Sequence, residues 1–141
     1  MARPTSYRDW KRELIESSKR SLAEARNLAK LKSFTSGHFE EGTGILSSLA
    51  YISRHVTDGN YTLDEVETSW AEINQLKRVP ALLLATEWYG FLKRDFQTGD
   101  DESCRECIKF IRQYLKEGGA TLADMGLSEK ELIKYTPVPQ L

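Results

Sequence analysis

The most apolar stretch of the chain runs from Val79 to Phe96, and it constrains the fold more than any other feature. At about 100° per residue, its apolar side chains fill roughly half of a helix circumference. They are Ala81, Leu82, Leu84, Ala85, Trp88, Tyr89, Phe91, Leu92 and Phe96. Pro80 suits a first helical position and Gly99 suits a helix end. The stretch therefore predicts a central helix that contacts more than one neighbour.

The sequence before this stretch predicts three helices. The first is expected from Thr5 or Ser6 to about Lys32, followed by a break over residues 33–37. The second is expected to begin between residues 38 and 43 and to end near residue 56. The residues Thr62 to Glu65 form a capping box that predicts the start of a third helix, which reaches residue 76. Because the connection to the central helix is so short, these two helices are expected to be antiparallel neighbours.

After the central helix, a fifth helix is expected over about 102–117, capped by Asp100 or Asp101 and ended by Gly118. Two further capping boxes begin at Thr121 and Ser128, and they predict two short helices joined at residue 126. No stretch alternates with period two for long enough to indicate a strand.

These patterns predict an all-α fold: one domain over residues 1–141, a bundle of about five main helices with a short helical C-terminal cap. Residues 1–5 and 136–141 are expected to be flexible ends. The predicted core is Trp10, Leu14, Ile45, Leu49, Ile52, Val56, Val66, Trp70, Ile73, Leu84, Trp88, Phe91, Ile108, Ile111 and Leu115.

The apolar runs are all far shorter than the roughly 18 residues that a membrane-spanning helix needs, so no membrane association is expected. The chain contains two cysteines, which are too few for a disulfide framework. Both observations favour a cytoplasmic location.

The charge of the chain is unevenly distributed, although the net charge is only −1. Residues 1–33 carry nine Lys/Arg against four Asp/Glu, whereas residues 34–76 carry one against seven. Five cations of the first helix fall within an arc of about 40°. They are Arg8, Arg12, Lys19, Arg26 and Lys30, which we call the basic stripe. The stripe suits phosphates or an acidic protein surface, and the alternative is a solvated helix face whose charges are balanced within the molecule.

The pair Cys104 and Cys107 lies near the predicted start of the fifth helix, where a thiolate is stabilised. The C-x-x-C spacing resembles that of the alkylhydroperoxidase-like family, in which a histidine follows the pair and relays protons. Here the residues after Cys107 are Ile108 to Ile111, with no histidine among them. The interpretation that agrees better with the sequence is two small apolar thiols on a buried helix face.

Other chemical sites find little support in the sequence. His38 and His55 are the only histidines, and their spacing puts them on different sides of a common helix, so a zinc site with the two cysteines needs long-range folding. No phosphate-binding loop, dinucleotide fingerprint, nucleophile elbow or H-E-x-x-H motif is present. We therefore expect no metal and no cofactor.

Residues 121–132 are loosely similar to the turn of a helix-turn-helix. Their second helix carries Glu129 and Glu131 beside Lys130 and Lys134, so it presents no net positive charge to a DNA groove. We interpret this segment as a structural cap.

The sequence thus predicts a non-enzymatic helical binding or adaptor protein, such as a small subunit of a larger assembly. Its expected partner is another protein or a second copy of itself, contacted through the basic stripe. Two alternatives stay open: a nucleic-acid-binding protein that uses the same stripe, and a thiol redox protein that uses Cys104 and Cys107.

Overall fold

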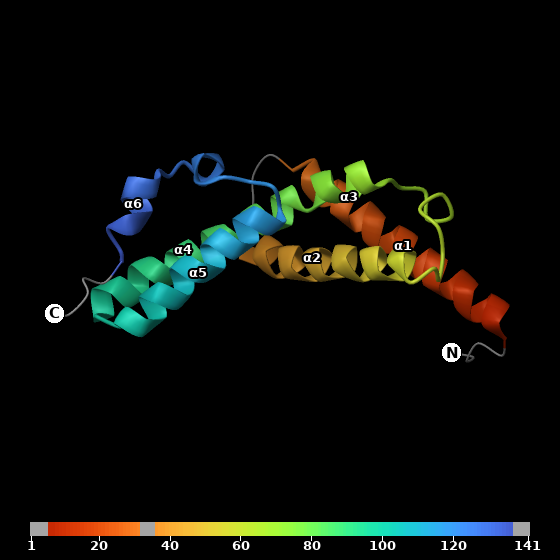
Figure 1. Ribbon diagram of the computed structural model, residues 1–141, viewed down its shortest axis with the longest axis horizontal. Coiled ribbons are helices and arrows are strands. Elements are labelled where there is room, and N and C mark those ends of the chain that lie inside the picture. Colours follow the sequence, from red (N-terminus) through yellow and green to blue (C-terminus); the bar gives the residue numbers. More distant parts are fainter. Residues whose placement is uncertain (1–5, 32–35, 137–141) are drawn as a thin grey trace.

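The computed structural model describes residues 6–31 and 36–136, and every regular element in these ranges is helical (Figure 1). The elements are α1 (Tyr7–Ala29), α2 (Ser36–Thr57), α3 (Trp70–Leu76), α4 (Arg78–Thr98), α5 (Asp101–Glu117), the 3₁₀ turn η1 (Leu122–Met125) and α6 (Glu129–Ile133). The predicted all-α bundle with a helical C-terminal cap is confirmed. The expected flexible ends, except residue 136, and most of the expected break at 33–37 lie outside the described residues.

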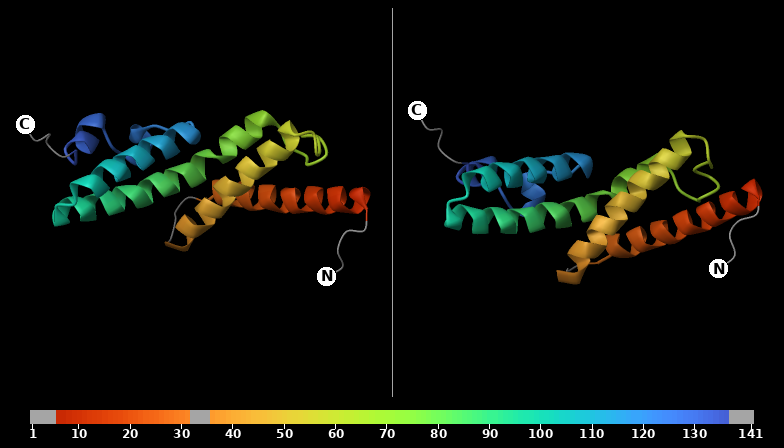
Figure 2. Two further views of the ribbon diagram at one scale, coloured as in Figure 1. Left: turned by 60° about the horizontal axis from the view of Figure 1, so that its bottom comes forward. Right: turned by 90° about the horizontal axis from the view of Figure 1, so that it is seen from below.

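The molecule is elongated, and α4 connects its two ends. α1, α2 and α3 gather at one end, while α5 runs antiparallel beside α4 at the other (Figures 1 and 2). α6 lies above the α4–α5 pair, near the end at which α4 finishes. The first turns of α1 extend past the end of α2 in each view, so this part of α1 has fewer neighbours than the rest.

The predicted helix over residues 62–76 is wrong in its first half. The capping box is present, because the Thr62 amide donates to Glu65 Oε1 at 3.0 Å and the Glu65 amide donates to Thr62 Oγ1 at 3.2 Å. It closes only a turn, since Glu67 follows with φ of 59°, a left-handed conformation that ends helical geometry. Ser69 then provides a second cap by accepting the Glu72 amide at 3.1 Å, and α3 begins at Trp70.

The expected antiparallel packing of this helix against the central helix is also wrong. Only Lys77 separates α3 from α4, and the helical hydrogen bonds continue across it: the Lys77 amide donates to Ile73 O at 3.2 Å, and the Ala81 amide donates to Lys77 O at 3.0 Å. α3 therefore continues almost directly into α4 (Figure 2). The antiparallel neighbour of α4 is α5, after the αL residue Gly99 has ended α4.

The buried side chains of the described residues form two clusters rather than one. The first joins α1, α2, α3 and the start of α4 through residues such as Leu22, Leu49 and Ile73. The second joins the rest of α4, α5 and the C-terminal cap through residues such as Leu92 and Ile111. Since α4 contributes to both clusters, it fulfils the predicted role of a central helix with several neighbours.

Most of the predicted core is buried or half-buried, and two tryptophans are the exceptions. Trp10 is 38% exposed, and it belongs to the first turns of α1. These turns extend past the end of α2 (Figure 1). Trp70 is 43% exposed, at the first position of a helix that begins later than predicted.

Candidate functional site: the charged face of α1

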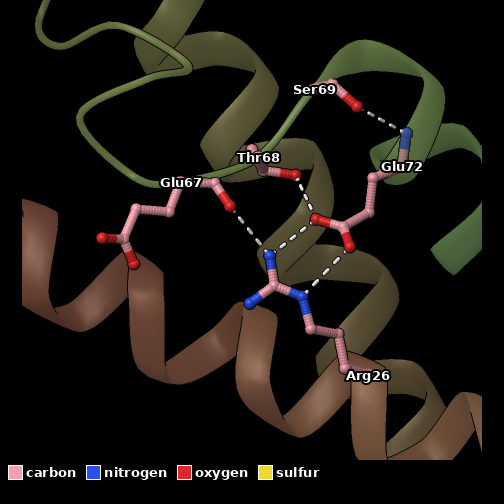
Figure 3. Close-up of polar contacts among 5 residues, drawn as sticks. All are labelled: Arg26, Glu67, Thr68, Ser69 and Glu72. Atoms are coloured by element: carbon pink, nitrogen blue, oxygen red, sulfur yellow. Dashed lines mark hydrogen bonds and ion pairs between the residues drawn. The ribbon is translucent and has the colours of Figure 1, made fainter.

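The most extensive polar network of the described residues joins Arg26 on α1 to the segment that leads into α3 (Figure 3). Arg26 Nε donates to Glu72 Oε2 at 3.1 Å, and Arg26 Nη2 donates to Glu72 Oε1 at 2.6 Å. The same Nη2 donates to the Glu67 carbonyl at 3.0 Å, while Thr68 Oγ1 donates to Glu72 Oε1 at 2.7 Å. We call this network the Arg26 clamp.

The clamp keeps its carboxylate ionised. Hydrogen bonds from Arg26 and then from Thr68 hold the pKa of Glu72 below its ordinary value. The bidentate pairing is the geometry in which a guanidinium binds a carboxylate most specifically. Because Arg26 also binds the carbonyl of Glu67, it stabilises the left-handed backbone at that residue.

Two more ion pairs connect α1 to residues 65–72, which we call the acidic segment because they include Glu65, Glu67 and Glu72. Lys11 Nζ lies 3.1 Å from Glu65 Oε2, and Lys19 Nζ lies 3.7 Å from Glu67 Oε1. The hydrogen bond from Lys11 is the largest cause of a lowered pKa at Glu65. Part of the opposite charge of residues 1–33 and 34–76 is thus balanced inside the molecule.

The cations of the basic stripe therefore differ in whether they are paired with a carboxylate. Arg26 and Lys19 face the acidic segment, and Arg12 Nη2 pairs with Asp9 Oδ1 of its own helix at 3.0 Å. Within the described part of the chain, Arg8 and Lys30 form no ion pair. The stripe is therefore not a continuous line of unpaired cations, and its role in binding stays a prediction.

The first turns of α1 carry two exposed aromatic side chains, Tyr7 and Trp10, whose exposure the sequence did not predict. The Tyr7 side chain is 66% exposed, and its ring centroid lies 5.6 Å from that of the half-exposed Trp10. Beside Tyr7 is a groove of about 550 Å³. Its lining consists of Tyr7, Arg8, Lys11, Arg12, Ile15, Glu16, Lys19 and Glu65, with four cations against two carboxylates. The sequence contains no signal for this exposure of the two rings, because it depends on how far the first turns of α1 extend beyond the core.

The two cysteines face the interior, as the buried-thiol interpretation predicts. Cys104 and Cys107 are 1% and 2% exposed, and neither is in a disulfide. Burial, followed by hydrogen bonding to Asp95, raises the pKa of Cys107 to about 11, and burial also raises the pKa of Cys104. A reactive thiol needs the opposite shift, so the surroundings of this pair do not favour redox chemistry.

Among the described residues, neither histidine forms a metal-binding group with the two cysteines. His55 is buried on α2, where its Nδ1 lies 2.8 Å from Asn60 Nδ2 and its ring packs between Tyr51 and Tyr61. Over residues 6–31 and 36–136, no group of three or more His, Cys, Asp or Glu side chains could hold a metal ion.

The C-terminal segment folds as a cap on α4 and α5. Both predicted capping boxes form, at Thr121 and at Ser128, and the αL residue Gly126 joins the two short helices. Arg78 at the start of α4 binds Asp124 with an N–O distance of 2.6 Å, and Arg112 of α5 binds Glu129. The charged side chains of Asp124 and Glu129 are thus used to attach the cap.

Comparisons with known proteins provide no family: no family model, curated protein or solved structure matches this chain. Within the described residues, no helix has the length and apolar character needed to cross a bilayer.

Proposed function

We propose that the protein is a non-enzymatic helical binding or adaptor protein that contacts its partner through the first turns of α1. The observation that carries this proposal is the exposed pair Tyr7 and Trp10, which lies beside the charged groove on the same turns. Tyrosine, tryptophan and arginine are the residues that most often dominate the free energy of binding between proteins.

The partner in this proposal is another protein, which presents several acidic side chains to the groove. Among the described residues Arg8 of the groove forms no ion pair, and Lys11, Arg12 and Lys19 form only surface pairs, with Glu65, Asp9 and Glu67, which a partner's carboxylates can replace. Carboxylates on a partner would be attracted to these cations, and its apolar side chains would pack against the two aromatic rings. A reducing compartment such as the cytoplasm agrees with the free thiols.

The nucleic-acid alternative uses the whole basic stripe as a phosphate track. It receives less support because Arg26, which lies between Lys19 and Lys30 on the stripe, is held by its bidentate pair with Glu72 and so interrupts the track. The thiol redox alternative receives less support because both sulfur atoms are buried.

The test is affinity purification of the tagged full chain from its host, with wild type compared to Trp10→Ser and Arg12→Glu. Both side chains are exposed, so circular dichroism should remain unchanged. The matched control is Arg20→Glu, which changes an exposed cation on another face of α1. We expect one acidic protein to be enriched with wild type and the control and lost with both variants. Equal recovery with all four proteins, or recovery of nucleic acid alone, would contradict the proposal.

A further inference from the structure

A second cavity lies where α4 finishes. The end of α4 is far from the first turns of α1 (Figure 1). Its volume is about 450 Å³, within the range typical of small-molecule sites. Lys93, Phe96 and Gln97 line it from one face of α4, and Lys134 and Tyr135 line it from the end of α6.

Aromatic rings form one part of this cavity. The centroid of Phe96 lies 5.2 Å from that of Tyr135, and Tyr135 lies 5.8 Å from Tyr89, with both pairs edge to face. Phe96 is still 49% exposed, although it is a large apolar side chain. Its open surface can stack against a planar ring, which is a favourable contact for any nucleobase.

Cations form the other part. Lys93 Nζ lies 4.9 Å from the ring centroid of Tyr89, and Lys134 Nζ lies 5.3 Å from that of Tyr135. Neither lysine forms an ion pair with any residue that the structure describes. Each ammonium group therefore lies over an aromatic face, with no carboxylate partner in the described part of the chain.

The nearby acids are directed elsewhere. Asp95 Oδ2 accepts a hydrogen bond from the Cys107 thiol at 3.6 Å, on the side of α4 that faces α5. Glu131 Oε1 accepts hydrogen bonds from the amide and hydroxyl of Ser128 at 3.1 and 3.0 Å. Among residues 6–31 and 36–136, no carboxylate lines the cavity, and none of these residues compensates its positive charge.

We propose that this cavity binds a planar aromatic ring that carries a phosphate, the chemistry of a nucleoside monophosphate. The ring stacks on Phe96 beside Tyr135, and the Gln97 amide can hydrogen-bond to the edge of the ring. Lys93 and Lys134 hold the phosphate, whose charge of about −2 at neutral pH matches two ammonium groups. This site is independent of the proposed protein contact on α1.

The test is isothermal titration of the full chain with three probes: adenosine monophosphate, adenosine and inorganic phosphate. We expect the monophosphate to bind with a Kd of about 0.01–1 mM. The two fragments should each bind at least about tenfold more weakly, because each makes only half of the contacts. The absence of saturable binding up to about 10 mM, or equal affinity for inorganic phosphate, would overturn the proposal.

Variants then locate the binding. Lys93→Ala and Lys134→Ala should each weaken binding of the monophosphate about tenfold, since each removes a charged hydrogen-bond donor. Phe96→Ala should lower the affinity for both the monophosphate and adenosine. The control is Lys130→Ala, an exposed lysine of α6 outside the cavity, which should bind as wild type does. A loss of affinity in the control as large as in Lys93→Ala would contradict the assignment.

Discussion

Removing the Arg26 side chain tests whether the Arg26 clamp stabilises the fold. Arg26→Ala deletes two hydrogen bonds to Glu72 and one to the Glu67 carbonyl. A buried ion pair that loses one partner costs about 3–5 kcal/mol, whereas an exposed pair contributes about 0.2–1 kcal/mol. The side chains of Arg26 and Glu72 are 35% and 34% exposed, so water and salt screen the pair partly. We expect a loss of about 1–2 kcal/mol in the free energy of unfolding.

Urea denaturation followed by tryptophan fluorescence measures this loss, because Trp70 begins the helix that the clamp attaches. A double-mutant cycle with Glu72→Ala should give a coupling free energy of about 1 kcal/mol. Arg20→Ala is the control for removing an exposed arginine from α1, and it should change stability by less than about 0.5 kcal/mol. If Arg26→Ala matches this control, the clamp does not contribute to stability.

The stability that the Arg26–Glu72 pair contributes should depend on pH in a defined direction. The pKa of Glu72 is lowered in the folded protein, so folding favours the ionised carboxylate. The stabilisation is complete above the ordinary pKa of a glutamate and is lost as pH falls through the lower folded value. The stability difference between wild type and Arg26→Ala should therefore shrink in acid. A difference that grows as pH falls would refute this assignment of charge.

Two other predictions concern the α4–α5 pair. Gly118→Ala should destabilise the protein by about 1–3 kcal/mol, because the new Cβ would lie 2.4 Å from Ala81 Cβ. Gly90→Ala, where nothing lies within 4 Å of the new Cβ, should be neutral or stabilising, and thermal unfolding of both variants checks the contrast. Cys104 and Cys107 should react with a disulfide reagent far more slowly in the native protein than in denaturant, and rapid native labelling would show that they are accessible.

Local signals in the sequence were sufficient to predict much of the fold. Asp100 caps α5 by accepting the Ser103 amide at 3.1 Å, and the αL residues Gly99 and Gly126 end α4 and η1. Each of these signals acts within a few residues, so it can be identified without tertiary structure. The inward position of Cys107 followed similarly from helical periodicity.

The start of α3 was predicted at the wrong residue, because the capping box at Thr62 was a strong local signal. Thr62 and Ser69 are both suitable helix caps, and only the cap at Ser69 begins a helix in the structure. In the structure, Arg26, which is distant in sequence, binds the Glu67 carbonyl, between the Thr62 turn and α3, and the Glu72 side chain. The partners of the basic stripe were unpredictable, since an ion pair between α1 and the acidic segment requires the tertiary fold. The sequence likewise did not predict that the first turns of α1, which carry Trp10, extend past the end of α2 (Figure 1).

Site-specific photocrosslinking in the host tests the proposed contact surface most directly. A photoreactive amino acid would replace Tyr7, the most exposed aromatic side chain of the first turns of α1. In a control protein it would replace Lys109, an exposed residue on α5. We expect a crosslink from position 7 to an acidic protein, lost when Arg12→Glu is added, and no such product from position 109. A crosslink to nucleic acid, or the same protein product from both positions, would contradict the claim that the first turns of α1 bind a protein partner.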